Sequence, residues 1–232
     1  MIEEPPILTI RERFPRPTPT QIEAFKGVPT GFVCDAMNGL GALDCAIQPI
    51  GNGRDIDCQA VGPALVADNG PAEILATMAA LHILQAGDIV VSAVHGYRNC
   101  SASGDQFCGM LKNKGAAGFV TDGQMRDYDG IVQVGMPVWC AGLSPNSPYS
   151  NGPARVGFGA TVGGRQIESG DLIVADRNGV VVVPFANIDA VADKVKHVKS
   201  LEDQLEEKVA KGFCEMRAIA DMINDGRAVV VD

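Results

Sequence analysis

The segment from Gly87 to Gly130, GDIVVSAVHGYRNCSASGDQFCGMLKNKGAAGFVTDGQMRDYDG, alternates strand-like and helix-like patterns. Its residues 89–94 are mainly β-branched and small apolar side chains, which is typical of a buried strand. Residues 103–114 have the pattern of a helix that ends at Gly115, and residues 117–121 form a second strand-like run. This alternation predicts an α/β fold in which helices are layered on a sheet.

The sequence on both sides of this segment continues the mixture of helices and strands. The stretch Thr18-Pro19-Thr20-Gln21 has a hydroxyl at the cap, proline at the first helical position and glutamine three residues after the cap. It predicts a short helix to about Lys26, and apolar spacing predicts another from Pro71 to Gln85. Later strand-like runs, separated by glycine turns, are residues 138–141, 154–162, 171–175 and 179–184. They either build a second sheet layer or complete the first one.

The C-terminal region has a different character. Residues 187–211 predict a long helix with charged side chains spread around it, and residues 228–231 are strand-like. A helix that is polar almost all round seldom packs alone. We interpret this helix either as an arm laid on a neighbouring subunit or as a solvated surface helix.

Composition narrows the class of protein. The chain has 232 residues, 46% hydrophobic and 20% charged, so we expect one domain over residues 1–232, with a proline-rich lead-in at about 1–17. A net charge of -9 without a Lys/Arg-rich run argues against nucleic acid as a partner. The acidic, proline-containing start predicts a cytoplasmic protein, and no apolar run suits a membrane helix. The seven cysteines form no C-x-x-C pair and are expected to be reduced and mostly buried.

Candidate functional residues follow the two predicted strands of the first segment. In open α/β sheets, ligands bind beyond the carboxyl ends of the strands, which is where Asp105 and the pair Arg126-Asp127 fall. The free N–H groups of Gly104, Asp105, Gln106 and Phe107 at a helix start would seat an anion such as a substrate carboxylate. These residues together predict a binding site for a carboxylic acid.

The Arg-Asp pair adds the chemistry of a metal-chelated 2-keto acid. Arg126 can hold a carboxylate or enolate oxygen through two N–H groups, and Asp127 can hold a hard cation through one oxygen. Mg²⁺, with Mn²⁺ as the alternative, is the natural cation for a single carboxylate with retained waters. The alternative is an ordinary surface ion pair, which Arg54-Asp55 shows to arise easily.

The three histidines have no metal-site spacing with one another. His82 fits the apolar helix pattern and His197 lies on the polar helix, so both are interpreted as structural or solvated residues. His95 follows a predicted strand and precedes a glycine, so it is a candidate substrate contact. Tyr97 and Arg98 share its loop and are candidates for selecting the second half of the substrate.

The order Asp105, twenty residues, then Arg126-Asp127, embedded in GDQF, GAAGFVTDG and RDYDG, resembles the RraA-like family, which includes 4-hydroxy-4-methyl-2-oxoglutarate aldolase. The similarity extends through GDLIVADRNGVVVVP and covers much of residues 30–210. The common family turn Pro-Gly-Asp is Ser169-Gly170-Asp171 here. The resemblance implies an α/β/α sandwich of the swivelling, phosphohistidine-domain-like type, assembled as a homotrimer or homohexamer with active sites between subunits.

The resemblance also implies roles for individual residues. Residues 104–107 would bind the substrate carboxylate, Arg126 the keto acid and its enolate, and Asp127 the metal, while Asp105 would hydrogen-bond metal-held water. A glutamate from the next subunit would fall near Glu202, with Glu206 and Glu207 close by.

The implied activity is that of a metal-dependent class II aldolase. A retro-aldol cleavage of a 4-hydroxy-2-keto diacid would release pyruvate and a second keto acid, and decarboxylation of oxaloacetate would pass through the same enolate. A Schiff-base mechanism would need a lysine in the pocket, and the candidate lysines lie on helices predicted to be solvated. The family also offers a non-catalytic alternative, since its namesake binds and inhibits a ribonuclease complex.

Overall fold

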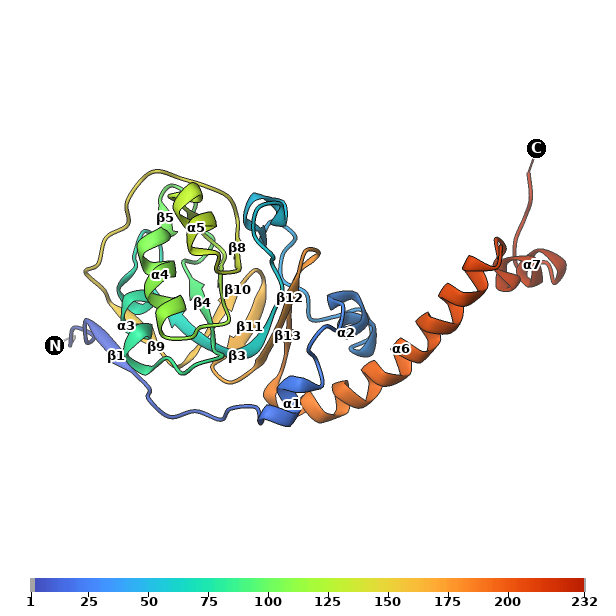
Figure 1. Ribbon diagram of the computed structural model, residues 1–232, viewed down its shortest axis with the longest axis horizontal. Helices are drawn as coiled ribbons and strands as arrows, with labels where there is room; N and C mark the ends of the chain where they lie inside the picture. Colours follow the sequence, from blue (N-terminus) through green and yellow to red (C-terminus); the bar gives the residue numbers. More distant parts are fainter. Residues whose placement is uncertain (1–2, 232) are drawn as a thin grey trace. The chain divides into compact units, whose positions relative to one another are not determined.

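The computed structural model describes residues 3–231, and its centre is a large mixed sheet (Figure 1). Within the described residues this sheet has nine strands, with the order β1-β9-β3-β4-β6-β8-β2, and β12 joins it through β3 and carries β13. Its strands are β1 (Leu8–Ile10), β2 (Gln48–Pro49), β3 (Ala60–Asp68), β4 (Ile89–Ala93), β6 (Gly118–Thr121), β8 (Val138–Cys140), β9 (Ala154–Val156), β12 (Leu172–Asp176) and β13 (Gly179–Val183).

The long strand β3 links two kinds of pairing. Its second half pairs in parallel with β4, whereas its first half pairs antiparallel with β12. From β4 the parallel arrangement continues through β6 to β8, and all five residues of β4 and all four of β6 are buried. Strands that are covered on both faces have continuous apolar sequences, which is why residues 89–94 and 117–121 predict buried strands.

Short helices cover this sheet. Helices α3 and α5 both contact α4, α3 also contacts β3 and β4, and Figure 1 draws the three helices beside β4. The helices of the chain are α1 (Pro19–Glu23), α2 (Thr30–Ala36), α3 (Leu75–Ile83), α4 (Asp105–Asn113), α5 (Tyr128–Val134), α6 (Ile188–Ala210) and α7 (Arg217–Asn224), with 3₁₀ turns η1 (Ile50–Gly53) and η2 (Phe185–Asn187). The predicted α/β class is therefore confirmed.

Two small two-stranded sheets lie outside the large one. Strands β5 (Ser101–Ser103) and β7 (Gln124–Met125) pair in parallel, and β10 (Gly159–Val162) and β11 (Arg165–Glu168) pair antiparallel. The predicted strand at 154–162 is interrupted between β9 and β10, where Gly157 has a left-handed backbone with a φ of 82°. The strands β12 and β13 complete the first sheet, whereas β10 and β11 stand apart from it.

The predicted start of the first helix is confirmed. Thr18 caps α1, and its side chain and that of Gln21 form the predicted capping box. The proline-rich lead-in, described from Glu3 onward, also contains the unpredicted strand β1, which pairs in parallel with β9. Residues 1 and 2 of this lead-in, and residue 232 of the tail, lie outside the described residues.

The chain divides into two compact units, the first ending at Val195 and the second beginning at Lys196. In the first unit, the start of α6 buries Ile188, Val191, Ala192 and Val195. The second unit holds the rest of α6 and the unpredicted helix α7. The strand expected at 228–231 is wrong, because these residues have no strand conformation and their exposed valines pair with no strand among the described residues.

Two further sequence-based expectations concern cysteines and membranes. All seven cysteines are free, and Cys58, Cys100, Cys108 and Cys140 are buried while Cys45 and Cys214 are exposed. Burial raises the pKa of the Cys108 thiol to about 12, which keeps it protonated and unreactive at neutral pH. Across residues 3–231, no helix has both the length and the apolar composition needed to cross a bilayer.

The close approach of β3 to the turn before β4 can be tested at Gly62. A Cβ added there would overlap the carbonyl oxygen of Gly87, which is backbone and cannot rotate away. We expect Gly62→Ala to lower the free energy of unfolding by roughly 1–3 kcal/mol, as overpacked sites do. Urea denaturation measures this.

The matched control is Gly31→Ala in α2, where an added Cβ meets nothing within 4 Å. Because alanine favours helix over glycine, this variant should be unchanged or more stable by up to about 1 kcal/mol. Equal losses of stability in the two variants would contradict the steric explanation.

Candidate functional site

A short parallel pair of strands brings the two candidate segments together. Strand β5 leads through Gly104 into α4, and β7 leads through Arg126 and Asp127 into α5. The Arg126 N–H donates to the Ser103 carbonyl oxygen at 3.1 Å, so the two segments lie side by side where the strands end. Asp105, Arg126 and Asp127, separated by twenty residues of sequence, therefore share one edge of the molecule.

Two glycines give these side chains the space they need. A Cβ at Gly104 would lie 2.6 Å from Asp127 Oδ2 and 3.1 Å from Arg126 Cγ. The φ of Gly104 is -148°, which other residues can also adopt, so a larger residue there would displace the Asp127 and Arg126 side chains without straining the backbone. A Cβ at Gly130 would overlap the carboxylate of Asp105. The backbone thus packs directly against the three functional side chains.

The polar contacts orient the arginine and the two carboxylates. Arg126 Nε lies 3.2 Å from Asp127 Oδ2, and Arg126 Nη1 donates to Ser147 Oγ at 2.7 Å. Asp127 has a left-handed backbone with a φ of 58°, which turns the chain into α5. Asp105 Oδ1 accepts the Gln106 N–H at 2.6 Å. The Arg126 and Asp127 side chains are 40% and 47% exposed, so both can meet a ligand.

A cavity of about 430 Å³ opens at these residues and has two chemically different walls. Its polar wall is Ser101, Ser103, Gly104, Asp105, Gln106, Arg126 and Asp127. Its apolar wall is Ile74, Met78, Leu81, Phe107, Met110 and Pro148. Six of the predicted site residues, 104–107 with 126 and 127, thus line one cavity.

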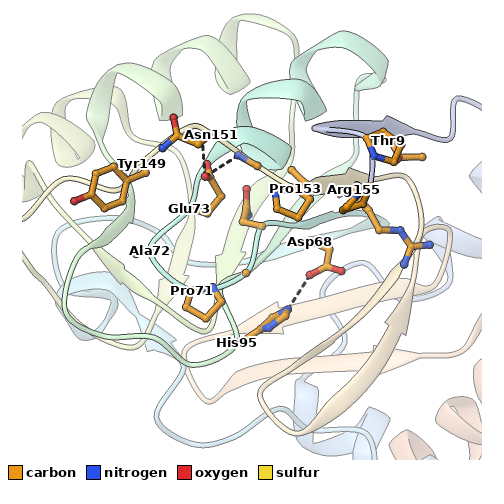
Figure 2. A pocket seen from close by; sticks show the side chains of 16 residues that line it. Thr9, Asp68, Pro71, Ala72, Glu73, His95, Tyr149, Asn151, Pro153 and Arg155 are labelled. Atoms are coloured by element: carbon orange, nitrogen blue, oxygen red, sulfur yellow. Dashed lines mark hydrogen bonds and ion pairs between the residues drawn. The ribbon is translucent and has the colours of Figure 1, made fainter. Parts of the chain in front are cut away.

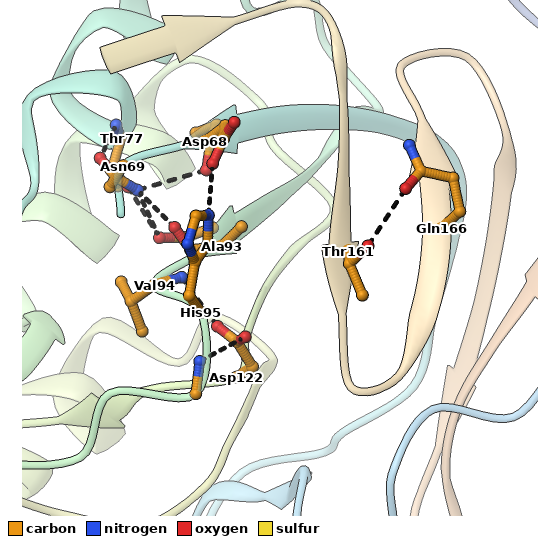
Figure 3. Close-up of polar contacts among 12 residues, drawn as sticks. Asp68, Asn69, Thr77, Ala93, Val94, His95, Asp122, Thr161 and Gln166 are labelled. Carbon is orange, nitrogen blue, oxygen red and sulfur yellow. Dashed lines mark hydrogen bonds and ion pairs between the residues drawn. The ribbon is translucent and has the colours of Figure 1, made fainter. Parts of the chain in front are cut away.

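His95 lies at other cavities than the one lined by Arg126 and Asp127. Its Nε2 lies 2.8 Å from Asp68 Oδ1, and it lines two other cavities, of about 810 Å³ and 580 Å³ (Figures 2 and 3). The turn that carries it is fixed by Asp122, whose carboxylate accepts the Val94 and Gly96 N–H groups at 2.8 Å each. With a left-handed φ of 55°, His95 meets the end of β3. His95 is therefore not among the described residues that line the cavity at Arg126, and its contact with a substrate stays a prediction.

Glu202, the predicted glutamate from a neighbouring subunit, lies on α6 in the second compact unit and is half-buried. Glu206 and Glu207 are exposed on the same helix. The role of this helix at another subunit's site remains a prediction.

The donor set of the site fits one kind of metal. Among the described residues, no group of three or more His, Cys, Asp or Glu side chains is gathered closely enough to hold an ion by itself. Asp127 and Asp105 do line one cavity together. One or two carboxylates completed by waters and substrate oxygens are how Mg²⁺ is usually held. The residues therefore fit a cation shared with a bound ligand and not an all-protein cage.

Sequence reasoning missed two parts of the site. The sequence pattern places Ser103 in the helix, but the residue ends β5, and its buried Oγ has no hydrogen-bond partner among residues 3–231. The apolar wall comes partly from Met78 and Leu81 of α3 and from Ile74, which precedes this helix, and the three recur at helical spacing. The sequence shows this spacing, which predicts one apolar face of a helix. It does not predict which other segment of the chain that face lies against.

Comparison with known proteins gives consistent results. A model of the family described as RraA-like, Aldolase/RraA, matches residues 30–182. A putative 4-hydroxy-4-methyl-2-oxoglutarate aldolase of Halalkalibacterium halodurans is 32% identical over 197 residues, which is 85% of this chain and 92% of the relative.

Two solved structures are similar over most of the chain. Streptomyces coelicolor RraAS2, described as an unusual member of the RNase ES inhibitor RraA family, has a TM-score of 0.72 and 26% identity, with 83% of this chain and 100% of that chain covered. An uncharacterized protein from Pseudomonas syringae pv. tomato has a TM-score of 0.73 and 22% identity, covering 87% and 97%. The latter likeness shows the fold alone.

The turn that carries His95 can be tested through Asp122. Burial raises the pKa of this carboxyl, although the two backbone N–H groups that it accepts oppose the shift. Because the folded-state pKa lies above the unfolded one, the stabilising contribution is complete below the unfolded pKa and is lost as the pH rises through the folded pKa. The uncharged Asp122→Asn variant lacks this titration.

We expect Asp122→Asn to be less stable than the wild type by about 1–3 kcal/mol near pH 4, because the amide NH₂ group, unlike either oxygen of the carboxyl group, cannot accept a backbone N–H. The difference from the wild type should shrink as the pH rises above the pKa of the unfolded state, because the wild type loses stability there and the variant does not. Urea denaturation of both proteins across this range measures it, and a difference that does not change with pH would contradict the raised pKa.

Proposed function

Because the chain belongs to the RraA-like family, we propose that it is a carbon–carbon lyase that cleaves a 4-hydroxy-2-keto acid and releases pyruvate. The observation that carries this proposal is the placement of Arg126 and the start of α4 around one cavity, with Asp105 and Asp127 beside them. The name of the H. halodurans relative supports the same reaction class, with 4-hydroxy-4-methyl-2-oxoglutarate as the type of substrate.

The start of α4 and Arg126 are the anion-binding parts of the site. The first N–H groups of a helix have no intrahelical acceptor, and at α4 the residue before the helix is a glycine without a capping side chain. The substrate carboxylate would bind there, close to the positive end of the helix. Arg126 would donate to the C2 keto oxygen and continue to do so as that oxygen becomes an enolate.

Asp105 is suited to handle the proton. A water held by its carboxylate would accept the proton of the C4 hydroxyl as the bond between C3 and C4 breaks. C4 becomes a carbonyl carbon, and the electron pair of the broken bond moves to the enolate at C2 and C3. C3 then takes a proton back from the same water, which completes pyruvate. Decarboxylation of oxaloacetate would use the same enolate, so it is a proposed second activity.

A divalent cation is part of the proposal, with Mg²⁺ or Mn²⁺ held by Asp127. When bound, it would supply Lewis-acid stabilisation of the negative charge on the keto oxygen. The Schiff-base alternative finds no support here, since no lysine lines the cavity among the described residues. We further propose a homotrimer or homohexamer in which Glu202 serves the site of a neighbouring subunit.

The reaction class can be tested by coupling pyruvate release to lactate dehydrogenase. Oxaloacetate and 4-hydroxy-4-methyl-2-oxoglutarate are the substrates, first with Mg²⁺ and then with excess EDTA. We expect metal-dependent pyruvate from at least one of them, because both reactions pass through the enolate that Arg126 stabilises. No pyruvate from either would favour the other role found in this family, which is to bind a ribonuclease or another protein.

The role of Arg126 can be tested separately. By analogy with removal of an oxyanion donor, Arg126→Ala should lower the rate on the order of 10²- to 10³-fold without unfolding the protein. The control is Arg54→Ala, which removes another exposed arginine that neighbours an aspartate, at 3.6 Å, but lies outside this cavity. Near-normal turnover in Arg126→Ala would reject the assignment.

A further inference from the structure

We propose that Ser147 is a positioning residue of the lyase site, whose Oγ holds one nitrogen of the Arg126 guanidinium so that another nitrogen of the same group is available to the substrate. This inference rests on the proposed function and adds to it the residue that orients the arginine. Two observations carry it: the contacts of the guanidinium, and the way in which the segment 144–152, which carries Ser147, is anchored.

The Arg126 guanidinium is held at two of its nitrogens. Its Nε lies 3.2 Å from Asp127 Oδ2, and its Nη1 donates to Ser147 Oγ at 2.7 Å. Because a guanidinium is planar and its N–H bonds point in fixed directions, two contacts also set the direction of the third nitrogen. This nitrogen, Nη2, makes no hydrogen bond with another of the residues 3–231, and Arg126 lines the cavity. It is therefore the part of the arginine that can donate to the keto oxygen.

Ser147 opposes a fuller pairing of the arginine with Asp127. Without another partner for the guanidinium, Asp127 could accept from two of its nitrogens at once, as in the bidentate pairs that arginine and carboxylates commonly form. Such a pair would use the donor needed by the substrate and would occupy the carboxylate proposed to bind the cation. By accepting from Nη1, Ser147 opposes this rotation. Its uncharged hydroxyl also leaves the positive charge of the arginine for the enolate.

The first part of the segment is anchored to the two short strands that carry the site. The Ser144 N–H donates to the Met125 carbonyl oxygen at 2.8 Å, and Met125 directly precedes the arginine. The carbonyl oxygen of Asn146 accepts from both the N–H and the Oγ of Ser101, at 2.9 Å and 3.0 Å. Met125 ends β7 and Ser101 begins β5. The same strand pair therefore places both the arginine and the serine that holds it.

The later part of the segment is anchored as well. The Tyr149 carbonyl oxygen accepts the Ile74 N–H at 2.9 Å. The carboxylate of Glu73, a residue only 7% exposed, accepts the N–H groups of Asn151 and Gly152 at 2.8 Å and 2.9 Å (Figure 2). The serine lies between these two anchors, so its hydroxyl is held in place before a substrate binds, as a positioning group requires.

The role of the hydroxyl is tested by pyruvate release with Mg²⁺ present, from whichever of oxaloacetate and 4-hydroxy-4-methyl-2-oxoglutarate is cleaved faster. We expect Ser147→Ala to lower kcat about fivefold to thirtyfold and to change KM less than about threefold, because the guanidinium contact strengthens as the enolate charge develops. Ser147→Thr keeps a hydroxyl at this position, so its kcat should lie within about threefold of the wild type. The control is Ser150→Ala, at an exposed serine of the same segment, which should have the wild-type kcat.

A double-mutant cycle separates positioning from a merely structural role. In the Arg126→Ala background there is no guanidinium to orient, so adding Ser147→Ala should change the residual kcat less than about twofold. The midpoint of urea denaturation should be the same in Ser147→Ala and the wild type, because the serine is exposed. A fall in kcat of equal size in both backgrounds would show a structural role and overturn the inference.

The remaining outcomes separate this inference from the proposed function. Pyruvate release by the wild type together with a near-normal kcat in Ser147→Ala would overturn the inference and leave the proposed function standing. No pyruvate from either substrate would overturn the proposed function, and the inference with it.

Discussion

The site depends on the parallel pairing of β5 with β7. Each strand is very short, yet the contact from the Arg126 N–H to the Ser103 carbonyl sets the two following turns side by side. Without it, the start of α4 and the Arg126-Asp127 pair would belong to separate loops. The buried strands β4 and β6 lie just before β5 and β7 in the sequence. Because β4 and β6 pair in parallel, the two segments that follow them leave the large sheet at the same edge.

Much of this arrangement could be predicted from the sequence. The capping box at Thr18, the buried strands and the start of α4 follow from local spacing, because each depends on interactions between near neighbours. The six residues of the site that came together follow from the strand ends, since ligand-binding residues in α/β sheets collect there. The family resemblance added the roles of these residues, which spacing alone leaves open.

The rest depended on contacts that local patterns do not encode. His95 follows β4 as expected. Its left-handed backbone and the two hydrogen bonds that Asp122 accepts from its turn place the His95 side chain beside Asp68. Ser103 precedes a helix, yet it is taken into a strand by pairing with residues far along the chain. The valines at 229–231 have high strand propensity but lack a partner strand in the structure. In each case a distant partner, or its absence, outweighed the local signal.

The apolar wall has a consequence for how this protein could change over evolution. Residues 74, 78 and 81, at the cap of α3 and within it, lie well before the stretch 101–127 that carries the polar groups. Met78 is 44% exposed, whereas Leu81 is partly buried against the core, so Met78 is the position that can change most freely. Part of the apolar lining thus comes from a different stretch of the sequence than the polar groups. A lineage could acquire new substrates by altering a single helix while inheriting the reaction intact.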